Sequence, residues 1–282
     1  MMRKISFDKI RKEIESLCLS AAFDLPDDVE NAIRKALKSE NTERGRAFLK
    51  QYLENAELAR NERLPICQDT GVAVFFVELG QDAAIEGGLL ADAISSGVND
   101  GYKAGFLRMS IVSDPLFERK NTKTNTPPVI HLKLVPGDKL KIILAPKGGG
   151  SENMSSLAML KPSDGRKGVV DFAVNTVIKA GGNPCPPTIV GIGIGGNFEM
   201  AALLAKTALL RNVGIPNPDS HYAELEEEIL QKINSSGVGP QGLGGSVTSF
   251  AVHIEIMPCH IASLPVAVNL NCHAARHKEI II

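Results

Sequence analysis

The sequence predicts an α+β protein in which a helical N-terminal region precedes mixed β-sheets with flanking helices. Apolar residues recur at helical spacing across residues 5–61. Short runs rich in Val and Ile, at 72–79, 188–192, 250–256 and 264–270, are typical of buried strands. Longer segments between these runs carry helical patterns, so helices should flank the sheets.

Residues 1–62 are expected to form a helical portion of the protein. Its first helix has an apolar face made by Ile10, Ile14, Leu17 and Ala21. A second start signal at Asn41-Thr42 leads into another helix. Cys18 falls inside the first pattern, where a thiol is most simply a small core residue.

The middle of the chain predicts one helix and one hairpin. Residues 85–107 have a helical pattern that contains Gly97 and Gly101. Apolar runs at 131–135 and 139–145 flank Pro136-Gly137-Asp138, which is typical hairpin turn chemistry.

Further helices are predicted at 167–180, 198–210 and 221–235, the first ended by Gly181-Gly182. The sequence contains no internal repeat and no linker. We therefore expect one continuous catalytic domain over 1–282, of which 1–62 is the helical portion.

Composition excludes several classes of function. The chain has 282 residues, 44% of them hydrophobic and 22% charged, with a formal net charge of −1. Such a balance gives no electrostatic footprint for nucleic acid or an anionic membrane. No apolar run approaches the roughly 20 residues of a membrane span. The N-terminus lacks a signal-peptide pattern, so a cytoplasmic protein is expected.

The five cysteines are odd in number and widely spaced, which argues against a disulfide framework. Cys67, Cys185 and Cys272 follow or precede apolar strands, in loops. An iron–sulfur cube normally takes four thiolates, so three would leave one iron open as a Lewis acid. Cys259 is an equally available thiol by spacing, and inert thiols or a catalytic cysteine remain alternatives.

Two loops carry candidate chemistry. Residues 65–71 (PICQDTG) present a thiol, an amide and the Asp69 carboxylate together, although Asp69 capping its own turn is the alternative. Residues 147–150 (KGGG) leave backbone N–H groups bare at a helix start, and Lys147 beside them favours anion binding over the alternative of a simple flexible turn. The segment does not match a Walker A loop. Arg108 could bind a carboxylate, or be an ordinary surface residue.

The motif at 191–196 (GIGIGG) matches the dinucleotide fingerprint literally. That fold requires an acidic residue about 20 positions later, after a second strand. Residues 211–220 are instead a turn-rich loop, so a dinucleotide-binding subunit is only a remote alternative.

Residues 253–277 contain four of the six histidines and two cysteines. We expect the strands on either side to deliver these side chains to one edge of a sheet. A metal-free pair of core strands with a polar turn is the alternative interpretation.

Four segments together resemble the class I fumarate hydratases, and more narrowly the α-type subunit shared with L-tartrate dehydratase. They are PICQDTG at 65–71, KGGGSENMS at 147–155, GIGIGG at 191–196 and HIASLPVAVNLNCHAAR at 260–276. The resemblance covers nearly the whole chain. It implies an enzyme of the tricarboxylic acid cycle that reversibly hydrates fumarate to (S)-malate, or alternatively one that dehydrates L-tartrate to oxaloacetate.

The resemblance also implies site residues. Cys67, Cys185 and Cys272 would hold a 4Fe–4S cluster with one open iron. Gln68, Asp69, Arg108, Gly149 and His260 would bind the dicarboxylate, with Asp69 and His260 catalytic and Asp69 a proton donor or acceptor. Cys259 departs from the family pattern beside His260 and is not assigned as a ligand.

Single-chain members of this family continue into a second domain, which supplies a threonine base and further cationic substrate contacts. The present sequence ends shortly after the last motif. We therefore expect a separate β subunit to complete the active site, in an α2β2 assembly.

Overall fold

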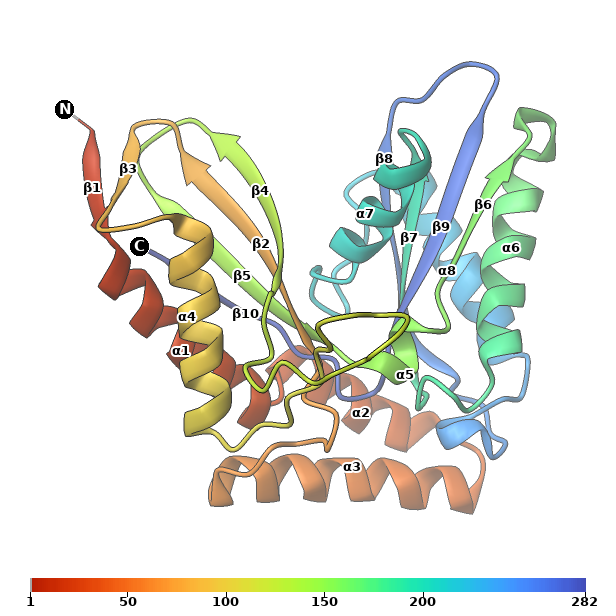
Figure 1. Cartoon of the computed structure of the whole chain (residues 1–282). Coiled ribbons are helices and arrows are strands. Elements are labelled where there is room, and N and C mark those ends of the chain that lie inside the picture. The colour runs from red at the N-terminus through yellow and green to blue at the C-terminus, as the bar shows by residue number, and fades with distance from the viewer. Residues whose placement is uncertain (1) are drawn as a thin grey trace. The chain divides into compact units, whose positions relative to one another are not determined.

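The computed structural model describes residues 2–282 and divides the chain into two compact units (Figure 1). Unit 1 consists of Met1–Leu25, Ala56–Gly149 and Arg276–Ile282. Unit 2 consists of Pro26–Asn55 and Gly150–Ala275. Helices and mixed sheets occur in both, which confirms the α+β class. The expectation of one continuous catalytic domain stays a prediction.

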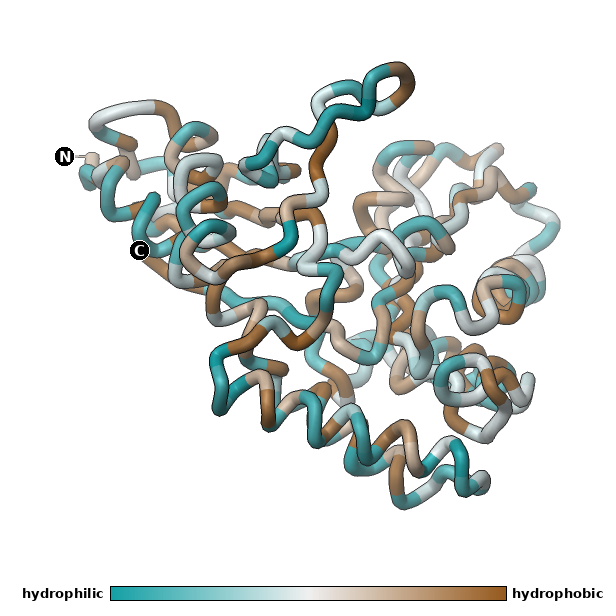
Figure 2. Tube along the Cα trace, turned by 60° about the horizontal axis from the view of Figure 1, so that its bottom comes forward, coloured by the Kyte–Doolittle hydropathy of each residue, from teal (hydrophilic) through white to brown (hydrophobic). Residues whose placement is uncertain are grey.

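The helical N-terminal region is confirmed, and a short strand, β1, precedes it. Its helices are α1 (Phe7–Phe23), α2 (Asp27–Ser39) and α3 (Glu43–Glu62), after β1 (Arg3–Ser6). The Ser6 side chain caps α1 by accepting from the Lys9 N–H at 3.2 Å. Polar and apolar residues alternate along the helical coils in Figure 2, as amphipathic packing requires.

Unit 1 contains a four-stranded sheet in the order β10-β5-β2-β4. Its core is made with α1 and α4 (Leu90–Ala104), and β1 pairs separately with β3 (Ala83–Glu86). The four strands are β2 (Val72–Gly80), β4 (Val129–Val135), β5 (Leu140–Lys147) and β10 (Lys278–Ile281).

The predicted hairpin in unit 1 is wrong, because β4 and β5 are not neighbours. Strand β2 lies between them, parallel to β4 and antiparallel to β5. The turn passes over the end of β2, where Gly80 donates to the Lys139 carbonyl at 2.8 Å. A Cβ at Gly80 would lie 2.4 Å from the Gly137 oxygen, so only glycine fits there. The turn residues predicted a reversal correctly but could not identify the pairing partner.

The two glycines inside α4 are explained by its packing on α1. A Cβ at Gly97 would lie 2.5 Å from the Arg11 carbonyl, and one at Gly101 would lie 2.7 Å from the Cys18 Cβ. The two helices therefore approach closely at these positions. Cys18 is 2% exposed in this interface, as expected of a core residue.

Unit 2 contains a second four-stranded sheet, in the order β6-β9-β7-β8. Helices α6 (Gly165–Ala180) and α8 (Ser220–Asn234) share one apolar core with it, and α7 (Phe198–Ala208) packs on the opposite face. The strands are β6 (Ser156–Leu160), β7 (Thr188–Gly195), β8 (Ser249–Met257) and β9 (Leu264–Asn271). Figure 1 shows this arrangement of helices on both faces.

The GIGIGG segment forms the end of β7 and serves helix packing. Val190 and Ile192 point into the core with α6 and α8, while the alternating Gly191 and Gly193 face α7. A Cβ at either glycine would lie 2.1 Å from a carbonyl oxygen of α7. The motif therefore has a packing explanation that requires no nucleotide. None of the helices in residues 2–282 combines the length and apolarity that a bilayer crossing needs.

The packing of α7 on β7 predicts that Gly193→Ala lowers the free energy of unfolding by about 3 kcal/mol, because the added methyl group overpacks the interface. Urea denaturation measures this loss. Gly214→Ala is the control: it has open space but a φ of 94°, so it should cost only about 1 kcal/mol. Equal stability of both variants would contradict the packing explanation.

Candidate active site

The register of β2 against β5 brings two predicted loops together in unit 1. Val72 pairs with Lys147, so the loop before β2 and the loop after β5 leave the sheet at the same edge. Gly71 permits this approach: its φ is 82°, and a Cβ there would lie 2.8 Å from the Lys147 nitrogen. Residues 65–71 and 147–149, which are far apart in sequence, therefore form one site.

Asp69 is the centre of this site. Its Oδ2 accepts from the Gly149 N–H at 2.8 Å and its Oδ1 from the Gly71 N–H at 3.1 Å. The Gly71 bond forms the predicted turn in which Asp69 caps its own backbone. The Gly149 bond joins Asp69 to the glycine loop. The Gly149 N–H, predicted to receive a carboxylate, is receiving one from the protein itself. This contact shows that the glycine loop has the geometry of a carboxylate receptor.

Cys67 and Gln68 lie beside Asp69. The Cys67 thiol is 3.4 Å from the Gln68 Oε1, and the Asp69 N–H donates to the sulfur at 3.4 Å. Cys67 is partly exposed and Gln68 is exposed. The loop therefore presents a thiol, an amide and a carboxylate side by side, as its sequence predicts.

Arg108 also belongs to this neighbourhood. Its carbonyl oxygen accepts from the Thr70 hydroxyl at 2.8 Å, which places its backbone against the loop that carries Asp69. The Arg108 side chain is exposed. The substrate-binding role expected of Arg108 stays a prediction.

Arg276 is a residue of this site that our sequence reasoning quoted in a motif but assigned no role. Its Nη2 donates to the Asp69 carbonyl at 3.0 Å, and the residue is only 7% exposed. Strand β10, which follows it, pairs with β5 and so returns Arg276 to the same edge. The sequence marks Arg276 by its place at the end of the 260–276 motif, while the strand that positions it, β10, was not predicted.

In unit 2, two of the predicted metal ligands lie at one edge of the sheet. Cys185 precedes β7, Cys272 follows β9, and these strands are antiparallel. We name this the cysteine edge. The His273 N–H donates to the Cys185 carbonyl at 3.2 Å, so the two loops are in direct contact. Cys185 is exposed and Cys272 partly exposed.

His260 and Cys259 lie at the opposite edge of this sheet, where β7 and β8 end and β9 begins. Strand β9 has eight residues, which at about 3.3 Å each separate the two edges by about 25 Å. The expectation that both strand ends deliver their side chains to one edge is therefore wrong. Period-two apolar patterns locate strands without revealing their direction in the sheet.

The local contacts of His260 fix its tautomer. Its Nδ1 accepts from the Ala262 N–H at 3.1 Å, which leaves the proton of the neutral ring on Nε2. The exposed side chain can thus donate from Nε2 to an anion. By contrast, His253 is 2% exposed, and burial lowers its pKa to about 4. His253 is a neutral core residue, as the structural interpretation of this segment expects.

The donors fit a group held by thiolates. Cys67, Cys185 and Cys272 are accessible thiols outside any disulfide, whereas burial raises the pKa of Cys18 to about 12 and makes it inert. Cys259 lies too far from Cys185 and Cys272 to share a group with them within one chain. In residues 2–282, no three His, Cys, Asp or Glu side chains are grouped around a metal position. The three thiols are divided between unit 1 and unit 2.

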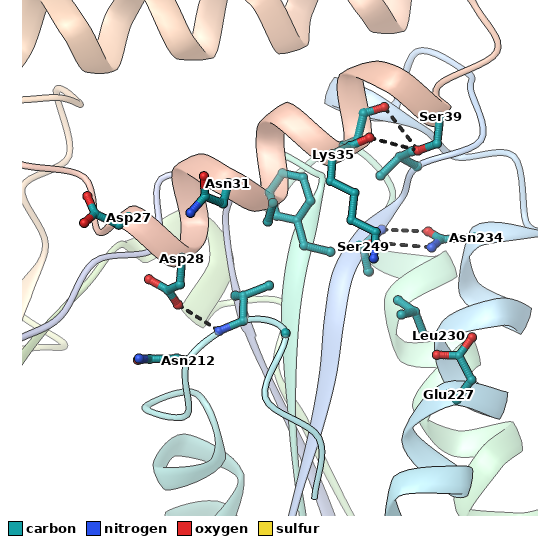
Figure 3. Close-up of a pocket in the computed structure, with 16 residues that line it drawn as sticks. Asp27, Asp28, Asn31, Lys35, Ser39, Asn212, Glu227, Leu230, Asn234 and Ser249 are labelled. Carbon is teal, nitrogen blue, oxygen red and sulfur yellow. Dashed lines mark hydrogen bonds between the residues drawn. The ribbon is translucent and has the colours of Figure 1, made fainter.

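A groove of about 720 Å³ in unit 2 lies between α2 and α8 (Figure 3). At its wall, Asp28 accepts from the Val213 N–H at 2.8 Å. The Asn234 side-chain amide donates to the Ser249 carbonyl at 3.2 Å and accepts from the Ser249 N–H at 2.9 Å. Its described lining includes none of the predicted site residues. We assign no catalytic role to this groove.

A carboxylate, a thiol and a backbone N–H that binds a carboxylate thus lie together at one edge of the unit 1 sheet. Comparison with known proteins identifies the class of the protein. The family model described as fumarate hydratase (fumerase) matches residues 11–281. The chain belongs to this family, as an α-type subunit of the fumarate hydratase and L-tartrate dehydratase group, and is a hydro-lyase.

Several relatives are similar over almost their whole length. A Methanocaldococcus jannaschii protein, provisionally named L(+)-tartrate dehydratase subunit alpha, is 44% identical over 95% of both chains. The L(+)-tartrate dehydratase subunit alpha of Escherichia coli O157:H7 is 31% identical, over 98% of this chain and 91% of its own. That of Shigella sonnei is 30% identical with the same coverage.

The Arg276 contact predicts that Arg276→Lys lowers hydro-lyase turnover at least tenfold and costs about 1.5–3 kcal/mol of stability, because a lysine ammonium cannot reproduce the planar guanidinium that donates to the Asp69 carbonyl. Steady-state kinetics and urea denaturation measure the two effects. Arg63→Lys, at an exposed arginine paired with Asp24, is the matched control and should change neither. Wild-type turnover in Arg276→Lys would exclude a role in positioning Asp69.

Proposed function

We propose that this chain is the α subunit of a cytoplasmic 4Fe–4S hydro-lyase that reversibly hydrates fumarate to (S)-malate. Cys67, Cys185 and Cys272 would hold the cluster. A separate β subunit would complete the active site, in an α2β2 assembly. One observation carries the proposal: the Asp69 carboxylate meets the Gly149 N–H at 2.8 Å, beside the Cys67 thiol.

The thiol set determines the chemistry of the proposed cofactor. When bound, the cluster supplies one iron that no cysteine holds, which polarises the hydroxyl and carboxylate oxygens of the substrate. The chain provides the ligands from loops at strand ends. Rigid strands thereby fix the direction of each accessible thiol.

The glycine loop and Asp69 would act in sequence on a diacid. A substrate carboxylate that takes the Gly149 N–H replaces the Asp69 Oδ2 as its acceptor. Asp69 keeps its bond to Gly71, and its released Oδ2 becomes available to give or accept a proton. The Gln68 amide and the Arg108 guanidinium, both exposed, would bind further substrate oxygens.

The ligand assignment predicts that Cys185→Ser abolishes hydratase activity, by at least a hundredfold, without unfolding the chain, because Cys185 is exposed and fills no core. Anaerobic turnover of fumarate and urea denaturation measure the two properties. The matched control is Cys259→Ser, an exposed cysteine at the opposite edge, which should stay within twofold of wild type. Full activity of Cys185→Ser would refute the assignment.

L-tartrate dehydration to oxaloacetate is the second candidate function. The names of the relatives favour it, since all those cited above are L(+)-tartrate dehydratase subunits. Both substrates are small dicarboxylates and would use the same residues of this chain. Anaerobic kcat/KM with fumarate, malate and L-tartrate decides between them: we expect fumarate to exceed tartrate at least tenfold, and the reverse order would assign the second function.

The proposed role of His260 requires a second copy of the chain. Within one chain, His260 and Cys272 are at opposite edges of the sheet, and a diacid on a cluster is far shorter than their separation of about 25 Å. The edge of the sheet that carries His260 also exposes apolar residues, including Phe198, which is 63% exposed, and Ile261, which is 91% exposed. Such exposed apolar groups are typical of an interface. We therefore propose that His260 serves the site of the other α chain.

This arrangement predicts complementation between two inactive variants, His260→Ala and Cys185→Ser. Random 1:1 re-assembly makes half of the α pairs mixed, each with one intact site, so about a quarter of wild-type activity should return. The control mixes Cys185→Ser with Cys272→Ser. Both substitutions are at the cysteine edge. If each cluster is held by the cysteines of one chain, neither chain of a mixed pair can bind it, and this mixture stays inactive. Failure of the first mixture to recover activity, with exchange verified, would contradict action across chains.

A further inference from the structure

The His273 side chain links the two cysteine loops of unit 2. Its backbone N–H and its Nδ1 both meet the Cys185 carbonyl oxygen, at 3.2 and 2.9 Å. Because a carbonyl only accepts, Nδ1 carries the proton in this contact. The residue directly after Cys272 thus holds the backbone of Cys185 by two bonds.

The side chain of Tyr52, in α3, packs against the His273 side chain. Its ring is stacked on the His273 imidazole, with centroids 3.7 Å apart and planes 9° from parallel. Its hydroxyl donates to the Pro186 carbonyl at 3.3 Å and accepts from the Gln241 Nε2 at 2.6 Å. The Gln241 N–H donates to the same Pro186 carbonyl at 2.9 Å. Burial raises the pKa of Tyr52, so its hydroxyl keeps its proton.

The backbone of Cys185 needs such support. Its φ is 53°, in the left-handed region that a non-glycine residue occupies only where its surroundings hold it. The Cys185 N–H donates to the Gly182 carbonyl at 3.0 Å, and its carbonyl is held by His273. Fixed backbones beneath accessible sulfurs are what a metal ligand requires, whereas a surface loop does not need them.

Core packing alone does not explain Tyr52. A phenylalanine would stack on His273 equally well. Within residues 2–282, the Tyr52 hydroxyl bonds to the loop that follows Cys185 and to Gln241, whose N–H also bonds that loop. The Tyr52 hydroxyl therefore contacts the residue next to Cys185, and the Tyr52 ring contacts the residue next to Cys272.

We propose that Tyr52 and His273 are positioning residues that fix the Cys185 and Cys272 thiols relative to each other and so slow the loss of iron from the bound cluster. This inference rests on the proposed function, because it takes these two cysteines as cluster ligands. Neither residue needs to touch the substrate. Their contribution is to hold two of the three thiols in a binding arrangement before and after the cluster enters.

The test uses Tyr52→Phe and His273→Phe, which keep an aromatic ring but remove one polar group each. Tyr222→Phe, at a tyrosine packed against the apolar core of the same unit, is the matched control. In the anaerobic complex with its β subunit, iron release to a chelator should be about tenfold faster in both test variants and unchanged in the control. Urea midpoints should stay close to wild type in all three.

A second readout needs no metal. In the folded metal-free chain, the backbone amides of residues 273 and 241 should exchange hydrogen about tenfold faster in the test variants. The reason is that the Cys185 and Pro186 carbonyls, which accept from these amides, are no longer held in place. Unchanged exchange would show that these contacts do not hold the loops. Faster exchange with iron release within twofold of wild type would show that they do not serve the thiols. A wild-type complex that contains no iron would instead overturn the proposed function. The hydrogen-exchange rates would still decide whether Tyr52 and His273 hold the two cysteine loops.

Discussion

The site in unit 1 depends on one constraint, the antiparallel pairing of β2 with β5 in a register that sets Val72 against Lys147. This register makes two distant loops leave the sheet at the same edge. Gly71 permits the close approach, and the Asp69 carboxylate then reaches the Gly149 N–H. A shift of one residue would turn every side chain of β2 to the other face and separate these groups. The chemistry of the loop is therefore a consequence of strand register.

Unit 2 applies the same kind of constraint to its thiols. Because β7 and β9 are antiparallel, the loop that ends before β7 and the loop that begins after β9 share an edge. The glycines of β7 allow α7 to pack flat on the sheet, which leaves the opposite face for α6 and α8. The same topology carries His260 to the far edge. A role for His260 at the thiols then implies two copies of the chain.

Much of this arrangement could be predicted from the sequence, for identifiable reasons. The apolar runs located most strands, and helical spacing located α1, α4, α6, α7 and α8. The PICQDTG and KGGG segments gave the carboxylate of Asp69 and the backbone N–H that it meets. Strand pairing could not be predicted, because Pro136-Gly137-Asp138 describes a chain reversal and not which strand lies beside it. The contacts of Tyr52 and Arg276 could not be predicted either, because they join segments that are distant in sequence and meet only in the folded chain.

We propose that three accessible thiols of this chain hold a 4Fe–4S cluster at which a dicarboxylate is hydrated. Iron and acid-labile sulfide, counted in the anaerobically purified complex with its β subunit, test it most directly. We expect about four of each per α chain, as one cubane cluster contains. A complex with neither iron nor sulfide that still turned over its substrate at full rate would contradict it.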